Sequence, residues 1–195
     1  MKLLFISLGC DKNLVDSEEM LGMLAADGHE IVDDEDEAEV IIVNTCCFIG
    51  DAKEESVNTI LEMAEKKKAG TCRVLIVTGC MAQRYKKEIS EEIPEVDAIL
   101  GTTSYCDIIK AVNEAEAGRH FEEYKSIDFL PDISGKRMLT TGGHFAYLKI
   151  AEGCDKHCTY CIIPKLRGHY RSVPMEQLVK EAQSLAEQGV KELIL

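Results

Sequence analysis

The sequence lacks any apolar run that approaches the roughly 20 residues needed by a membrane-spanning helix. It also lacks a recognisable signal at its start, because the apolar segment after Met1 and Lys2 is short and follows a single basic residue. We find no low-complexity segment. These absences favour a cytoplasmic protein, in which the nine cysteines are expected to be metal ligands or free thiols rather than disulfides.

Positive charge is scarce in the first two thirds of the chain. The whole sequence holds 22 Lys/Arg against 35 Asp/Glu and has a net charge of −13 at pH 7. Residues 136–195 hold nine Lys/Arg against six Asp/Glu, so residues 1–135 carry a net charge of −16. Because an acidic surface repels the phosphate backbone, we do not expect nucleic acid to bind through this portion.

Apolar runs typical of buried strands alternate with helical patterns over residues 1–118. The expected strands are 2–8, 29–32, 40–43, 73–77 and 97–100, and the expected helices are 13–27, 51–68, 83–92 and 104–117. This alternation predicts an α/β fold, in which an open parallel sheet is flanked by helices.

Three of the expected strands are followed by a cysteine, namely Cys10, Cys46 and Cys80. Parallel strands present their carboxyl ends at one edge of the sheet, where open α/β sheets bind ligands. We therefore expect these three cysteines to converge, although they are far apart in the sequence. Three thiolates suit an iron–sulfur cluster with one open iron, and the alternative is that they are buried apolar residues. Glycines before Cys10 and Cys80 would allow the backbone to approach a bulky cofactor.

Three further cysteines lie outside this set. Cys72 precedes a strand and Cys106 lies in an expected helix, so both are predicted to be packing residues. Cys47 directly follows Cys46 and could replace it as a ligand. The register of the strand end favours Cys46.

The regular pattern weakens over residues 119–143 and then restarts. Pro131, Ser134 and several glycines are typical of a linker between a domain at 1–118 and a second domain that starts at residue 144. A strand at 145–150, a helix at 173–188 and a strand at 190–195 form one βαβ unit. Because one such unit cannot cover both faces of its strands, 144–195 is expected to be the start of an incomplete domain.

Within this unit, Cys154, Cys158 and Cys161 have the spacing C-x3-C-x2-C. A tetrahedral zinc site and a cubane iron–sulfur cluster both require four ligands. This loop supplies three cysteines, and no further cysteine follows it. His157 is adjacent to Cys158, and adjacent residues rarely bind the same ion. We therefore predict a 4Fe–4S cluster with one open iron, and a zinc knuckle or a disulfide loop is the alternative.

The loop, with the aromatic Tyr160 before its last cysteine, resembles the signature of the radical S-adenosylmethionine (SAM) enzymes. The resemblance implies a partial TIM barrel in which the open iron chelates the amino and carboxylate groups of SAM. The reduced cluster then cleaves SAM to a 5′-deoxyadenosyl radical. Tyr160 is expected to pack against the adenine, and simple hydrophobic packing is the alternative.

A domain with three strand-end cysteines ahead of a radical SAM loop resembles the methylthiotransferase family over essentially the whole chain. The resemblance implies an auxiliary 4Fe–4S cluster on the strand-end cysteines, a SAM-binding cluster on the loop, and a β-barrel substrate module beyond the partial barrel. Residues 7–18 and 161–168 are similar to the RimO branch, which modifies an aspartate of a small-subunit ribosomal protein. Asp11 and Cys47 stand where that branch usually has proline and glycine, and the second departure leaves open which thiol binds.

The implied reaction inserts a methylthio group at the β-carbon of the aspartate. One SAM supplies the radical, the auxiliary cluster delivers sulfur, and a second SAM supplies the methyl group. An electron donor such as flavodoxin or ferredoxin is implied, and the 195-residue chain is expected to be inactive alone. Two alternatives remain open: a tRNA adenosine methylthiotransferase, and a non-catalytic iron–sulfur or zinc-binding protein.

A short basic strip follows the loop and consists of Lys165, Arg167 and Arg171. Such a strip is expected either to contact SAM or the substrate, or to form a solvated surface. The sequence does not distinguish these two interpretations.

Overall fold

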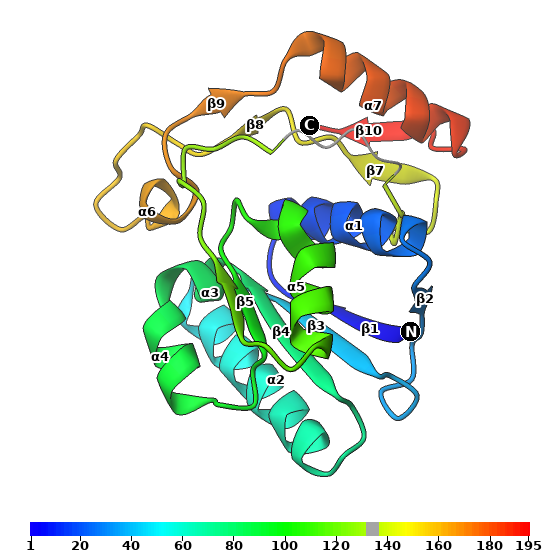
Figure 1. The fold of residues 1–195 in the computed structure, drawn as a ribbon. Helices are drawn as coiled ribbons and strands as arrows, with labels where there is room; N and C mark the ends of the chain where they lie inside the picture. Colours follow the sequence, from blue (N-terminus) through cyan, green and yellow to red (C-terminus); the bar gives the residue numbers. More distant parts are fainter. Residues whose placement is uncertain (132–136) are drawn as a thin grey trace.

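The computed structural model describes residues 1–131 and 137–195. Its central element is a six-stranded parallel sheet in the order β2-β1-β3-β4-β5-β6 (Figure 1). The strands are β1 (Lys2–Ser7), β2 (Glu30–Ile31), β3 (Val40–Thr45), β4 (Val74–Gly79), β5 (Ala98–Leu100) and β6 (Phe121–Glu123). The α/β fold with an open parallel sheet, predicted from the alternating pattern, is confirmed.

Helices cover both faces of this sheet. One face packs against α1 (Asp11–Ala26) and α5 (Ile108–Glu116), which the 3-10 turn η1 (Tyr105–Asp107) precedes. The other face packs against α2 (Gly50–Lys68), α3 (Cys80–Arg84) and α4 (Lys86–Glu92). None of the described helices is long and apolar enough to cross a membrane.

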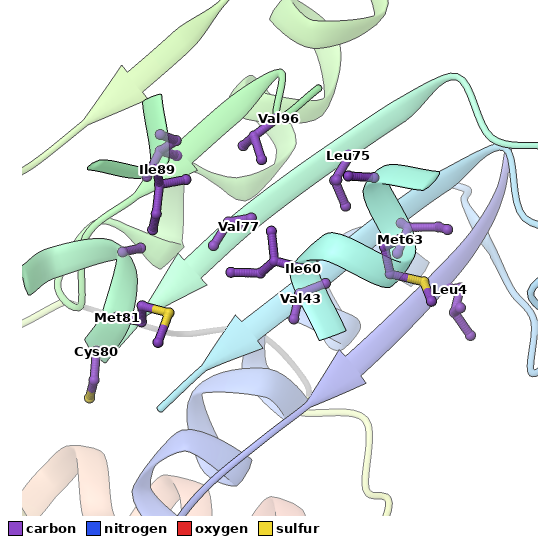
Figure 2. Packing of buried hydrophobic residues seen from close by; sticks show 14 of the residues in the cluster. Leu4, Val43, Ile60, Met63, Leu75, Val77, Cys80, Met81, Ile89 and Val96 are labelled. Carbon is purple, nitrogen blue, oxygen red and sulfur yellow. The ribbon is translucent and has the colours of Figure 1, made fainter. Parts of the chain in front are cut away.

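The central strands are apolar on both sides because successive side chains point to opposite faces. Ile42 belongs to the cluster with α1 and α5, whereas its neighbour Val43 belongs to the cluster with α2. Figure 2 shows the second cluster, in which Ile60 lies near Val43 and Val77, and Cys80 lies at the edge of the group. The core therefore extends to the carboxyl end of β4.

Two segments differ from the sequence prediction. The expected helix at 83–92 is two helices, α3 and α4, which meet at Tyr85. β6 lies within the predicted linker and pairs with β5, but a three-residue strand with one apolar side chain, Phe121, gives no recognisable period. Ser134, part of the same predicted linker, lies outside the described residues.

The second part of the chain contains the predicted βαβ unit. β7 (Phe145–Tyr147) pairs in parallel with β10 (Glu192–Ile194), and α7 (Met175–Glu187) connects them. Leu148, Leu185 and Val190 form a small separate core beneath α7. A second pair of strands, β8 (Ala151–Glu152) and β9 (Arg171–Ser172), is antiparallel and brackets the cysteine loop and α6 (Ile163–Arg167).

Helix α1 lies between the sheet and this second part (Figure 1). Met20 and Leu24 pack on the sheet. On the other side, Glu18 is buried and pairs with Arg137, with its Oε2 3.0 Å from the arginine Nε. The helix thus buries apolar side chains against the sheet and charged side chains against the second part.

Candidate metal centres

The structure places the three strand-end cysteines at the same edge of the sheet. Cys10 is the residue before α1, Cys46 follows β3, and Cys80 begins α3 directly after β4. Cys46 and Cys80 are 4% and 5% exposed, whereas Cys10 is exposed. The parallel sheet thus brings together thiols that are widely separated in the sequence.

Two glycines allow this close approach. Gly79 has a φ of +94°, and a Cβ added there would lie 2.3 Å from Asn44 Oδ1 and 2.5 Å from the Thr45 carbonyl oxygen. Gly9 has a φ of +97°, and an added Cβ would lie 2.6 Å from Cys46 Cβ. A side chain at either position would therefore clash and would require a backbone conformation that L-residues rarely adopt.

A buried asparagine, Asn13, connects the loops that carry these cysteines. Its Nδ2 donates to the carbonyl oxygens of Leu8 and Thr45 at 3.0 and 2.9 Å. Its Oδ1 accepts from the Cys80 thiol at 3.8 Å. One side chain on the first turn of α1 therefore contacts all three loops.

Burial raises the pKa of the Cys80 thiol to about 12, and the Arg167 guanidinium acts against this rise. Burial also raises the pKa of the Cys47 thiol, which packs in the α2 cluster and donates to the Cys80 carbonyl oxygen at 3.3 Å. This bond places the Cys47 sulfur beside Cys80. The choice of Cys46 over Cys47 as the ligand stays a prediction.

The donor atoms at this edge are of the kind that iron–sulfur clusters use in proteins. Among residues 1–131 and 137–195, no group of three or more His, Cys, Asp or Glu side chains is arranged around a point that could hold one metal ion. A cubane cluster is larger than an ion, so its ligands do not need to meet at one point. The three cysteine thiols fit an iron–sulfur cluster in donor type, whereas Gly9 and Gly79 make close contact with Cys46, Asn44 and Thr45.

The other three predicted ligands lie in a loop that is closed at its base. β8 and β9 pair on either side of it, and the Cys154 N–H donates to the Gly168 carbonyl oxygen at 3.0 Å. Gly153 has a φ of +77°, and a Cβ there would lie 2.0 Å from the His169 carbonyl oxygen. Only glycine fits at this crossing of the two chain segments.

Within the loop, the contacts are short-range. The Cys161 N–H donates to the Cys158 carbonyl oxygen at 3.0 Å, and His157 has a φ of +47°. Cys158 is exposed, and Tyr160 is 86% exposed. The Tyr160 ring is therefore free to pack against a ligand, and its contact with SAM stays a prediction.

Asp155 adds further contacts at the base of this loop. Its Oδ1 accepts from the Tyr170 N–H at 3.1 Å and lies 3.1 Å from His169 Nδ1. These hydrogen bonds lower the pKa of the Asp155 carboxyl. An exposed carboxylate thus ties the start of the loop to the segment just before β9.

The prediction that Arg167 belongs to a basic strip that contacts a ligand or solvent is wrong. This side chain is 1% exposed, and its Nη1 lies 2.9 Å from both Asp16 Oδ2 and Glu152 Oε2. Its other nitrogen, Nη2, donates to Asn13 Oδ1 at 2.6 Å. Arg167 is therefore neither a solvated residue nor free to bind a ligand, because a buried charge must be paired.

Asn13 was not expected from the sequence, and Arg167 was expected in a basic strip rather than among buried ion pairs. The pattern of α1 predicted one apolar face, yet the helix also buries Asn13, Asp16, Glu18 and Glu19. The signal that could have revealed these buried polar residues is their high density in a helix that must pack on a sheet. It does not reveal the partners, which for Asp16, Glu18 and Glu19 lie more than 100 positions away.

The remaining cysteines occupy other places. Cys72 is 3% exposed in the α2 cluster, as expected for a packing residue. Cys106 is partly buried and accepts a hydrogen bond from Lys125 Nζ at 3.1 Å. Neither lies in the two candidate sites.

Comparison with known sequences gives matches over both parts of the chain. Residues 2–101 match the family described as Uncharacterized protein family UPF0004. Residues 148–195 match the Radical SAM superfamily. The second match covers β8, the cysteine loop and α7, and it confirms the resemblance found in the loop.

Curated relatives are similar to the chain over its whole length. Proteins named "Ribosomal protein uS12 methylthiotransferase RimO" are 65% identical in Lachnoclostridium phytofermentans and 52% identical in Clostridioides difficile, each over 195 residues and 100% of this chain. A third, from Trichlorobacter lovleyi, is 51% identical over 100% of this chain. The chain spans 44%, 44% and 43% of these relatives' lengths.

Proposed function

Since the chain belongs to the UPF0004 family and continues into a radical SAM segment, we propose that it is the N-terminal portion of a methylthiotransferase that modifies ribosomal protein uS12. The proposed product carries a methylthio group on the β-carbon of an aspartate. The observation that carries this proposal is the 65% identity to a RimO protein along the whole chain.

Each set of cysteines is proposed to hold a 4Fe–4S cluster. Cys10, Cys46 and Cys80 would hold the auxiliary cluster, and the loop cysteines would hold the cluster that binds SAM. When bound, these groups supply the electron for radical chemistry on SAM and the sulfur for transfer.

The chain's own residues position these groups. Asn13, Gly9 and Gly79 shape the sheet edge, and Gly153 closes the base of the loop. The exposed Tyr160 is proposed to pack against the adenine of SAM.

We further propose a domain arrangement and a set of partners. The first domain is proposed to span 1–118, with a linker at 119–143 and the radical SAM part at 144–195. A cytoplasmic location and an electron donor such as flavodoxin or ferredoxin are consistent with reductive chemistry on a ribosomal protein. The net charge of −16 over residues 1–135 disfavours tRNA as the molecule bound by this portion.

The test offers both substrates to the full-length enzyme that contains this chain. The anaerobic enzyme receives SAM and a reductant together with either a uS12 peptide or tRNA. Mass spectrometry then measures methylthio addition on the peptide and on the digested nucleosides. We expect addition on the aspartate and none on adenosine.

Two controls define the alternatives. A variant with Cys154, Cys158 and Cys161 changed to alanine should show no addition to either substrate. Modified adenosine without modified aspartate would overturn the proposal in favour of a tRNA enzyme. Zinc in place of iron, with no absorption typical of an iron–sulfur cluster, would indicate a binding protein instead.

A further inference from the structure

Asn13 is fully buried, and both polar atoms of its side chain make hydrogen bonds. Its side-chain bonds to Leu8, Thr45 and Cys80 reach the three loops that carry the strand-end cysteines. Its backbone carbonyl oxygen accepts from Asn44 Nδ2 at 3.0 Å, which adds a second contact to the end of β3. A buried side chain with this many partners is expected to fix the geometry of its surroundings.

Arg167 reaches the same point from the other part of the chain. It lies at the end of α6, and its guanidinium crosses to Asn13 Oδ1 at 2.6 Å. The ion pairs with Asp16, on α1, and Glu152, on β8, hold the guanidinium in this position. The planar group thus contacts both parts of the molecule at once.

A short path connects Arg167 to the cysteine loop. The next residue, Gly168, accepts the backbone hydrogen bond of Cys154. Arg171 Nη2 donates to the Arg167 carbonyl oxygen at 3.1 Å, which ties this turn to β9. A displacement of Arg167 is therefore transmitted to the base of the loop.

We propose that Asn13 and Arg167 are positioning residues that hold the strand-end cysteines and the cysteine loop in one fixed arrangement. This inference rests on the proposed function, because it takes both sets of cysteines to be cluster sites. It adds that the two sites are connected by one buried hydrogen bond between an amide and a guanidinium. Loss of that bond should loosen both sites together rather than one alone.

The first experiment needs no cluster. Hydrogen exchange is measured by mass spectrometry on the metal-free full-length protein, for the wild type and for Arg167→Lys. Lysine keeps the positive charge but lacks the planar fork, so it cannot contact Asn13, Asp16 and Glu152 at once. We expect amides in residues 8–13 and 44–47 and those in 153–168 to exchange about tenfold faster or more, because a hydrogen bond to a charged group is lost.

The matched control is Arg119→Lys, which alters an exposed ion pair with Glu114 and should leave both segments unchanged. If Arg167→Lys speeds exchange throughout, including α5, the variant is unfolded and Asn13→Leu takes its place with the same expectation. That substitution has a similar size but removes both the acceptor for Arg167 and the donor to Leu8 and Thr45. Faster exchange in only one of the two segments, or in neither, overturns the inference.

The second experiment reports on the auxiliary site alone. In a background with the three loop cysteines changed to alanine, Asn13→Asp should reduce the iron retained after anaerobic reconstitution to half or less. It should also alter the electron paramagnetic resonance spectrum of the iron that remains. The matched control Asn58→Asp, on the exposed side of α2, should retain the full amount.

The outcomes separate the inference from the proposed function. If the wild type binds iron at both sites but Asn13→Asp retains all of it with an unchanged spectrum, the inference fails and the function stands. If the wild type binds no iron, the proposed function fails whatever the exchange data show.

Discussion

The strand-end cysteines and the loop cysteines are positioned in different ways. Cys46 and Cys80 are almost fully buried and reach one edge through the parallel sheet. Cys158 is exposed, and the loop cysteines lie within one short segment, residues 154–161, which backbone hydrogen bonds close at its base. The strand-end site is assembled from distant segments and therefore requires the whole sheet. The site in the cysteine loop requires only the spacing of its cysteines and the pairing of β8 with β9.

This difference has a consequence for stability. The strand-end site shares its side chains with the core, so changes there are expected to affect folding and binding together. The loop is mostly exposed, so changes within it are expected to affect binding alone. Four predictions test this contrast, and the first has the largest expected effect.

Removing one set of cysteines should leave the other set occupied. The full-length enzyme is expected to bind about eight irons per chain after anaerobic reconstitution. Changing Cys154, Cys158 and Cys161 to alanine should leave about half of the iron and abolish methylthio transfer. Iron analysis of the desalted protein provides the measurement. Loss of all iron, or of none, would contradict two independent sites.

Arg167→Met should cause the largest loss of stability among these substitutions. It removes the guanidinium from the buried carboxylates of Asp16 and Glu152, which keep Lys149 as a partner, and breaking a buried ion pair in this way typically costs about 3–5 kcal/mol. Urea unfolding followed by circular dichroism measures the change. As the control, Arg73→Met breaks exposed ion pairs and should cost about 0–1 kcal/mol. Equal losses in the two variants would show that the junction is not stabilised by this network.

Gly79→Ala tests how tightly the sheet edge is packed. The added Cβ meets Asn44 and Thr45 at a positive φ, so we expect a loss of about 2–4 kcal/mol from strain and overpacking. Gly28→Ala is the matched control, because Gly28 has a φ of +90° with no atom within 4 Å of the added Cβ. The control should lose about 1–2 kcal/mol from backbone strain alone. A similar loss in both variants, measured by urea unfolding, would argue against close packing at the edge.

The junction beside α1 should make stability depend on pH. Burial raises the pKa of Glu19 to about 7 from the ordinary value of 4.5, and Lys149 opposes this rise. Between these values the folded chain binds more protons than the unfolded chain, so stability should fall as the pH rises through this range. Thermal unfolding from pH 4.5 to 8 measures the trend, and Glu19→Gln should flatten it. An unchanged slope in that variant would assign the effect to another group.

Several features followed from local sequence alone. The apolar runs of β3 and β4 identified a buried parallel sheet because every residue of these strands is buried. The cysteine after each strand could be assigned to one edge because parallel strands end there. The loop motif needed no fold at all, since its spacing lies within a few residues.

Other features depended on pairing that no local pattern shows. Arg167 looked like part of a basic surface strip, but it is buried because Asp16 and Glu152 approach it from α1 and β8. β6 was missed because a short strand is stabilised by its partner β5 more than by its own residues.

The sequence by itself thus determined the parallel sheet, the order of its elements and the two sets of cysteines, because periodicity and spacing are local properties. Only the tertiary structure decided that Asn13 joins the three strand-end loops and that Arg167 reaches it from the second part. The physical reason is that a buried polar group must find its partner wherever the folded chain brings one within hydrogen-bond distance.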